Sequence, residues 1–153
     1  HGTEEGVLKE GAGHMQETSL PIGGENTHCV LAGHSGMSSA KMFTRLDELQ
    51  KGDVFLISVC NQTLCYQVCE IRTVRPDTED VIKIQEGEDR ISLITCTPYG
   101  LNTHRLVVTG ERITKEEVQE EKVLVQRVSK RERIWLGGVI LVVVIGVYRR
   151  LRK

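Results

Sequence analysis

Apolar and β-branched residues gather in short runs along most of the chain, separated by segments rich in turn-forming residues. The clearest pair of runs is Ile91–Thr95 and Arg105–Val108, which a loop rich in Pro, Gly and Asn joins. Apolar and β-branched residues favour strands, and Pro, Gly and Asn favour a chain reversal. We therefore predict two paired strands, which would bring Cys96 at the end of one close to Arg105 at the start of the next.

Three further runs predict strands. Val54–Val59 and Leu64–Arg72 flank Asn61-Gln62, and this arrangement is typical of a β-hairpin. His28–Gly33 predicts a strand that leads directly into His34.

Helical patterns are short in the first part of the chain. The segment His1–Met15 holds a helical candidate that Thr3 can cap. A second helix is predicted from Ser38 or Ser39 to about Gln50, because its apolar residues share one stripe. The stripe consists of Met42, Phe43, Leu46 and Leu49.

The C-terminal part has a different pattern. A helix rich in acidic and basic residues is predicted from about Lys115 to Glu132, and Ile134–Tyr148 then contains fifteen residues without a charge. As a helix, this run is about 22 Å long, against a bilayer core of about 30 Å. Trp135 at one end and basic residues on both flanks favour a membrane-spanning helix over a buried core helix. Charge on the two flanks does not decide its orientation.

Composition narrows the class of protein. Hydrophobic residues make up 39% of the chain and charged residues 27%, which is ordinary for a globular domain. The formal net charge is −1, so no overall basic field favours nucleic acid as a partner.

The chain contains five cysteines, so at least one thiol is unpaired. Cys60, Cys65 and Cys69 are spaced C-x4-C-x3-C and lack the CxxC spacing of common metal sites, so we interpret them as core-filling residues. Cys96 is different because a neighbouring guanidinium favours thiolate over thiol and can hold charge that develops on a carbonyl oxygen. The alternative is that Cys96 is a small core residue and Arg105 a solvated one.

Two segments resemble motifs of one enzyme family. SLITC resembles the TLxTC strand-end motif of sortases, with Ser92 in place of the first Thr, and TPYGLNTHRL resembles the form found in class C sortases, which assemble pilins. HCVLAGHSG resembles the segment that carries the catalytic histidine of the family, although many relatives have Arg where this chain has Ser35. The three catalytic positions of the family fall on His34, Cys96 and Arg105.

The resemblance implies an all-β fold, a sortase-like closed β-barrel with peripheral short helices and a C-terminal transmembrane helix. Residues 1–112 would form the catalytic domain, 113–133 a helical juxtamembrane linker, and 134–153 the transmembrane helix and basic tail. The loop Asp77–Arg90, which precedes the cysteine strand, would help to form the substrate groove.

The implied activity is transpeptidation at an LPXTG-type sorting signal, with cleavage between Thr and Gly. Cys96 would form a thioester, Arg105 would stabilise the oxyanion, and His34 would transfer protons. The partners would be LPXTG-bearing surface or pilin proteins and an amine acceptor, either a pilin Lys or a cell-wall precursor. The chemistry needs no metal and no cofactor.

The resemblance also implies a location, the outer face of a Gram-positive cell membrane, with a single-pass C-terminal anchor. In class C sortases the segment similar to residues 1–24 lies inside the domain, so we expect the first strands and an active-site lid to lie upstream of His1. A cytosolic, tail-anchored domain is the alternative topology.

Two other functions remain open at this point. One is a cysteine hydrolase that uses the same three residues with water as acceptor. The other is a non-catalytic, membrane-anchored interaction domain.

Overall fold

The computed structural model describes residues 2–35, 42–78 and 82–114. These residues form one six-stranded sheet with little helix around it, so the domain is mostly β, as predicted. In chain order the elements are α1 (Glu5–Glu10), β1 (Gly13–His14), β2 (Thr27–Ala32), the 3₁₀ helix η1 (Leu46–Glu48), β3 (Val54–Val59), β4 (Gln62–Val74), β5 (Asp89–Thr97) and β6 (His104–Ile113).

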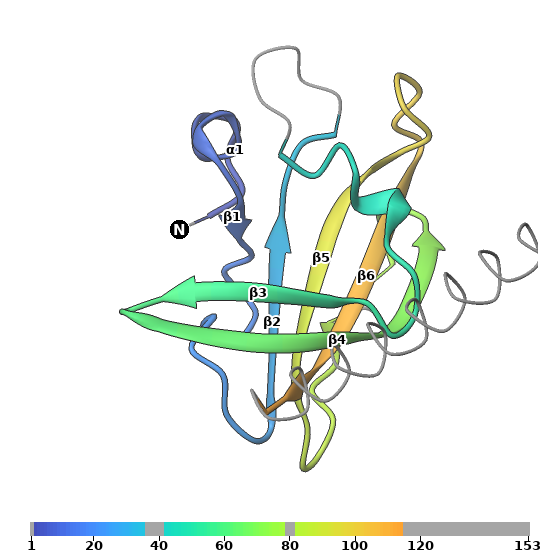
Figure 1. The fold of residues 1–153 in the computed structure, drawn as a ribbon. Coiled ribbons are helices and arrows are strands. Elements are labelled where there is room, and N and C mark those ends of the chain that lie inside the picture. The colour runs from blue at the N-terminus through green and yellow to red at the C-terminus, as the bar shows by residue number, and fades with distance from the viewer. Residues whose placement is uncertain (1, 36–41, 79–81, 115–153) are drawn as a thin grey trace, which may run out of the picture. The chain divides into compact units, whose positions relative to one another are not determined.

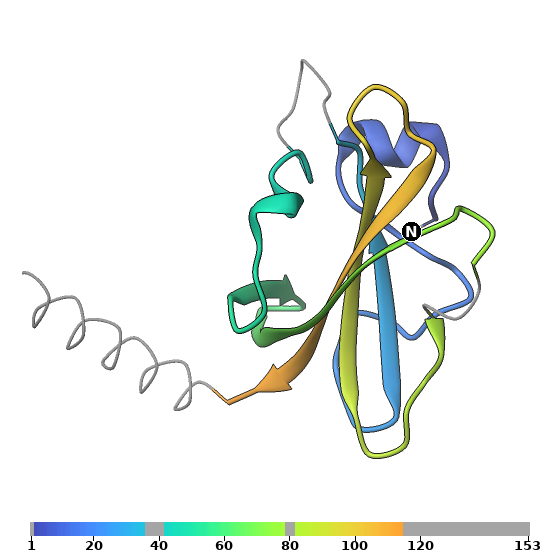
Figure 2. The same ribbon diagram turned by 90° about the vertical axis from the view of Figure 1, so that its right-hand side faces the viewer.

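The strand order across the sheet is β1-β2-β5-β6-β4-β3, and the sheet curls so that the β3–β4 hairpin lies across β2, β5 and β6 (Figure 1). β2 and β5 are parallel, and the other neighbouring strands are antiparallel. The strands are strongly twisted, and β6 runs obliquely to β2 in Figure 2.

The predicted closed β-barrel is wrong for the described residues, which form a curled, open sheet. A barrel closes when its two outermost strands pair with each other. Here β1 and β3 are the two edges, and their partners within the described ranges are β2 and β4. β1 has two residues, too few to offer a long ladder to another strand.

β5 is buried on both faces of the sheet, which explains its continuous apolar run. All five residues of Ile91–Thr95 are buried, and successive side chains point to opposite faces. The larger core lies on one face, and side chains of β3 pack against it from the hairpin. A smaller cluster of Val30, Ile94 and Val107 lies on the other face. Full burial of an Ile or Val stabilises the fold by about 1.5–3 kcal/mol per side chain, so β5 contributes to the stability of both layers.

Both predicted strand pairs are confirmed. β5 pairs with β6, and β3 pairs with β4. The hairpin reverses at Cys60-Asn61, one residue earlier than predicted, because these two residues have φ angles of 48° and 62°. A tight hairpin turn needs positive φ at its two central residues, and Asn adopts such angles more readily than Gln.

The helix predictions are partly right. α1 falls inside the predicted segment, but its N-cap is Glu4 rather than Thr3, and no side chain caps it. The helix predicted from Ser38 or Ser39 to about Gln50 is wrong where the structure describes it, since η1 is the helical part of residues 42–50. Its apolar stripe is nevertheless used, because Leu46 is buried and Phe43 packs against the same core.

The described residues belong to one compact unit, His1–Thr114. Of the predicted linker at 113–133, residues 115–133 lie outside the described residues, and so do the predicted transmembrane helix and basic tail at 134–153. Within residues 2–35, 42–78 and 82–114, no helix is long and apolar enough to cross a bilayer.

Candidate active site

Three chain segments meet at one end of the sheet. β2 leads into Gly33 and His34 at the end where its parallel neighbour β5 finishes with Cys96 and Thr97. β6 is antiparallel to β5 and therefore begins at this same end with His104 and Arg105. The topology brings together residues that lie 62 positions apart in the sequence, since 96 − 34 = 62.

His34, Cys96 and Arg105 line one cavity of about 610 Å³. Apolar side chains of Met15, Val74 and other residues cover much of its remaining wall. The structure therefore places all three residues predicted for the site around one cavity. Their catalytic roles remain predictions.

Cys96 lies directly opposite Arg105 in the β5–β6 register, which confirms the predicted neighbourhood. Nη1 of Arg105 donates to the backbone oxygens of Asn102 at 3.1 Å and His104 at 3.0 Å. A guanidinium has five N–H donors, and those on Nη2 and Nε are not used by these two bonds. The loop between the strands therefore orients the fork of Arg105 and leaves donors that can bind a negatively charged oxygen.

Two hydroxyl groups fasten the cysteine end of β5 to the histidine end of β2. Ser35 Oγ donates to the backbone oxygen of Cys96 at 2.8 Å, and Thr95 Oγ1 donates to that of Gly33 at 2.7 Å. The first bond joins the residue after His34 to Cys96, and the second joins the residue before Cys96 to the residue before His34. No function was predicted for Ser35 or Thr95 from the sequence, although both carry a hydroxyl group and lie next to His34 and Cys96.

Gly33 precedes His34 because a side chain has no room there. A Cβ atom built on Gly33 would lie 2.7 Å from Cδ2 of Phe43, which packs over the backbone at this point. The close approach of the Phe43 ring, together with the bond from Phe43 N to the oxygen of His34 at 3.1 Å, sets the path of the chain through His34.

The five thiols differ in environment. Burial raises the pKa of Cys29 to about 12 and also raises the pKa of Cys69. Cys65 is buried, Cys60 is exposed, and Cys96 is half-buried and lines the cavity. Within the described ranges, no group of three or more His, Cys, Asp or Glu side chains could hold a metal ion.

The other described histidines have different surroundings from His34. His14 lies 2.9 Å from the oxygen of Ser19 through Nε2, and His28 is buried in a polar network. His104 is exposed, with Nδ1 2.9 Å from the hydroxyl of Thr103. Among the four described histidines, His34 is the one that lines the cavity with Cys96.

Comparisons with known proteins agree on one family. A family model described as a sortase domain matches residues 1–113. The crystal structure of sortase C-1 from Actinomyces oris is similar with a TM-score of 0.73 and 54% identity, over 74% of this chain and 63% of that one. The sortase C of Streptococcus pneumoniae, described in terms of catalysis and pilin substrate specificity, gives a TM-score of 0.72 and 50% identity, over 74% and 60% of the two chains.

Among curated proteins, Sortase A of Streptococcus agalactiae serotype III is 31% identical over 119 residues, which is 72% of this chain and 47% of the relative. The chain spans about half the length of the curated relatives that it matches.

Proposed function

The chain belongs to the sortase family, and we propose that it acts as a cysteine transpeptidase on an LPXTG-type sorting signal. The observation that carries this proposal is the convergence of His34, Cys96 and Arg105 on one cavity, with Cys96 and Arg105 in direct register. A thiol, a guanidinium and an imidazole are the groups that acyl transfer through a thioester needs: a nucleophile, an oxyanion donor and a proton carrier.

In the first half-reaction, the Cys96 thiolate attacks the Thr carbonyl of the Thr–Gly bond. The carbonyl oxygen becomes negatively charged in the tetrahedral intermediate, and the N–H donors of Arg105 bind it. The C–N bond then breaks, His34 as imidazolium gives its proton to the leaving Gly amine, and the Thr carbonyl remains on sulfur as a thioester.

In the second half-reaction, an amine attacks the thioester. His34, now neutral, accepts the proton that the amine loses, and Arg105 again binds the oxyanion. Collapse of this intermediate forms an amide and releases the Cys96 thiolate, so the site returns to its starting state. The acceptor amine must compete with water, which requires a site that positions the amine.

We assign the acceptor amine to a Lys side chain of a pilin protein. The similarity to class C structures at about 50% identity supports this choice over a cell-wall precursor. The proposal includes a location on the outer face of the cell membrane, held by a C-terminal helix, where such acceptors occur.

The test is to incubate the protein with an LPXTG-type peptide and a Lys-containing pilin domain, and to identify the products by mass spectrometry. We expect cleavage between Thr and Gly and an isopeptide bond from the Thr carbonyl to the Lys amine. The Cys96→Ala variant should give no product.

The same experiment separates the alternatives. Free acid as the sole product at saturating acceptor would identify a hydrolase instead. Absence of cleavage, combined with tight binding of the peptide, would favour a non-catalytic interaction domain.

A further inference from the structure

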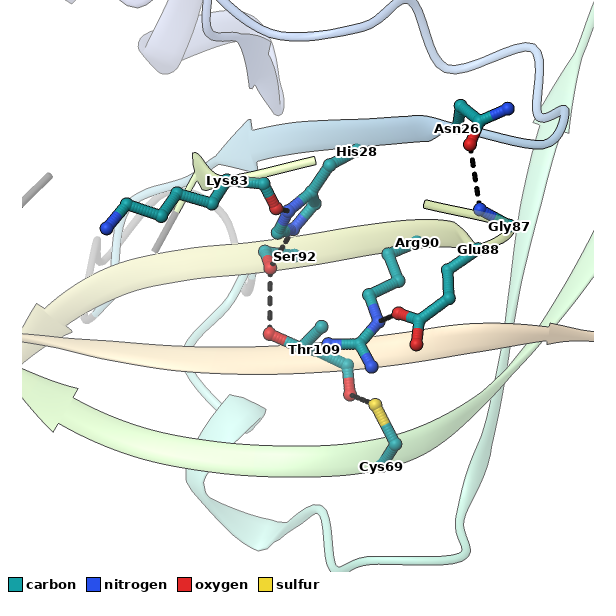
Figure 3. A network of polar contacts seen from close by, with 9 residues as sticks. All are labelled: Asn26, His28, Cys69, Lys83, Gly87, Glu88, Arg90, Ser92 and Thr109. Atoms are coloured by element: carbon teal, nitrogen blue, oxygen red, sulfur yellow. Dashed lines mark hydrogen bonds and ion pairs between the residues drawn. The ribbon is translucent and has the colours of Figure 1, made fainter. Parts of the chain in front are cut away.

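A buried row of polar side chains, none of them one of the three candidate catalytic residues, crosses the sheet from β2 over β5 to β6 (Figure 3). His28 on β2, Ser92 on β5 and Thr109 on β6 have 5%, 0% and 3% of their surface exposed. Three polar side chains in neighbouring strands, each almost fully buried, are costly to the fold unless their hydrogen-bonding groups are paired. Such a row therefore needs an explanation beyond filling space.

The hydrogen bonds in this row form one continuous chain. His28 Nδ1 lies 2.9 Å from the backbone oxygen of Lys83, and His28 Nε2 lies 2.8 Å from Ser92 Oγ. Ser92 Oγ lies 2.8 Å from Thr109 Oγ1. Both ring nitrogens of His28 are thus used, one toward the sheet and one toward a segment that precedes β5 (Figure 3).

The chemistry of the partners determines where the protons are. A backbone oxygen can only accept, so His28 Nδ1 carries the hydrogen that it donates to Lys83. Burial, as the main cause, lowers the pKa of His28, and the ring is therefore neutral at neutral pH. Nε2 of a neutral ring accepts, so Ser92 donates to it and Thr109 donates to Ser92. All hydrogen bonds of the row therefore point the same way, from Thr109 through Ser92 and His28 to the backbone oxygen of Lys83.

The residue next to Lys83 is part of the cavity wall. Ile82 lines the cavity and packs against the cluster of Val30, Ile94 and Val107. At the far end of the same segment, Gly87 N donates to Asn26 Oδ1 at 2.7 Å and Thr27 N donates to the oxygen of Glu88 at 3.1 Å. His28 therefore holds segment 82–88 to the sheet at its cavity end, and Asn26 and Thr27 hold it at the other.

We propose that His28 is a positioning residue for substrate binding, which holds the Ile82 wall in place through its bond to Lys83. This role rests on the proposed function, because it concerns the binding of the substrate peptide in that cavity. His28 lines no part of the cavity and contacts no reacting atom. Its loss therefore acts on the fit of the peptide and leaves the chemistry at Cys96 unchanged.

The first experiment compares steady-state kinetics of variants of the full chain on an LPXTG-type peptide. His28→Leu removes both ring bonds, and we expect KM to rise about tenfold while kcat at saturating peptide stays within about threefold. His28→Gln keeps a donor for Lys83 and an acceptor for Ser92, so it should restore most of the binding. Ser92→Ala leaves the ring in place but removes its donor, and we expect a smaller rise in KM.

The matched control is Cys29→Ala. Cys29 is the next residue of β2, is 2% exposed and packs into the core on the other face of the sheet. It shares the strand and the burial of His28 but no bond of the row, so its loss should lower stability without a selective rise in KM. If Cys29→Ala raises KM as much as His28→Leu, or if His28→Leu leaves KM unchanged, the positioning role is overturned. Should His28→Leu fail to fold, Ser92→Ala takes its place. A rise in KM that is larger in Ser92→Ala than in His28→Gln and Cys29→Ala supports the positioning role, and an unchanged KM in Ser92→Ala overturns it.

The second experiment does not depend on activity. Amide hydrogen exchange of the full chain should be faster across residues 82–88 in His28→Leu than in the wild type, and unchanged there in Cys29→Ala. Equal exchange in His28→Leu and wild type would show that His28 does not anchor the segment. If the wild type turns over no peptide while exchange responds as expected, the proposed function fails and the anchoring role of His28 stands.

Discussion

β6 carries an arginine near each of its ends, and the two have different surroundings. Arg112 is paired: its Nη1 lies 3.8 Å from Oδ2 of Asp89, and its guanidinium lies over the ring of Tyr66, 5.4 Å from the centroid. Arg105 donates to two backbone oxygens of its own loop, and in the described part of the chain no carboxylate forms an ion pair with it.

This difference decides what each arginine can do. Asp89 also accepts from Tyr66 Oη at 2.9 Å and from Gly24 N at 2.8 Å, so the Arg112 end of the sheet is a closed set of mutual contacts. The positive charge of Arg112 is compensated within the protein. The charge of Arg105 borders the cavity with Cys96 beside it, and the N–H donors that its own loop does not use can bind a negatively charged group there. The same residue type on one strand thus supports the fold at one end and is suited to chemistry at the other.

The largest effect should come from Cys96. Cys96→Ala should remove turnover completely, because no other thiol lines the cavity beside Arg105 within the described residues. In the wild type, Cys96 should also react with an alkylating reagent faster than exposed Cys60, since Cys96 is the proposed nucleophile and lines the cavity opposite Arg105. Peptide mapping after brief alkylation measures both rates.

The control for this prediction is Cys60→Ser, which changes an exposed thiol in the β3–β4 turn and should keep full turnover. Faster labelling of Cys60 than of Cys96 would contradict the assignment of the nucleophile.

The next effect tests the two arginines against each other. Arg105→Lys should lower kcat by on the order of 10²-fold or more, a typical loss for an oxyanion donor, because an ammonium lacks the planar fork. Arg112→Lys should leave kcat nearly unchanged and lower the free energy of unfolding by about 1 kcal/mol through weaker contacts with Tyr66 and Asp89. Kinetics and urea unfolding of both variants provide the measurement, and similar losses of kcat in the two would show that Arg105 and Arg112 do not differ in role.

A smaller effect is expected at Ser35, whose hydroxyl ties the His34 segment to the backbone of Cys96. Ser35→Ala should lower kcat by about tenfold, the usual scale for a lost hydrogen bond at a part-buried carbonyl. Ser35→Thr retains the hydroxyl and should recover most of the activity. Single-turnover formation of the thioester reports this step, and equal rates for the Ala and Thr variants would mean that the bond does not position the site.

The smallest effect concerns pH and lies away from both arginines, at His28. Burial lowers the pKa of this ring in the folded protein, whereas the unfolded chain keeps the ordinary value of about 6.5. As pH falls below that value, the unfolded state binds a proton that the folded state does not, so the free energy of unfolding decreases. Above it, His28 contributes no pH dependence. Urea midpoints measured across this range should show a decline toward acid that is weaker in His28→Gln, and an identical decline in both proteins would exclude His28 as its source.

Local pattern was enough to predict much of the site from the sequence. β5 and β6 are joined by a short loop, so the turn sets which residues face each other, and the pairing of Cys96 with Arg105 followed from it. The β3–β4 hairpin was predictable for the same reason. For His34, the assignment came from the resemblance of its segment to a family motif, and the structure places the residue in the same cavity.

Tertiary structure decided what depends on contacts between distant segments. The parallel pairing of β2 with β5 joins residues about sixty positions apart, and no turn specifies it. That pairing creates the Ser35–Cys96 bond and the row from His28 to Thr109, and the packing of Phe43 over Gly33 depends on the same assembly.

The open sheet and the short η1 in place of a longer helix were likewise decided in three dimensions. Apolar periodicity identifies which side chains of residues 42–50 are buried, but several backbone paths bury the same side chains. A hydrophobic pattern therefore determined which residues enter the core, and the packing of distant strands determined how the chain brings them there.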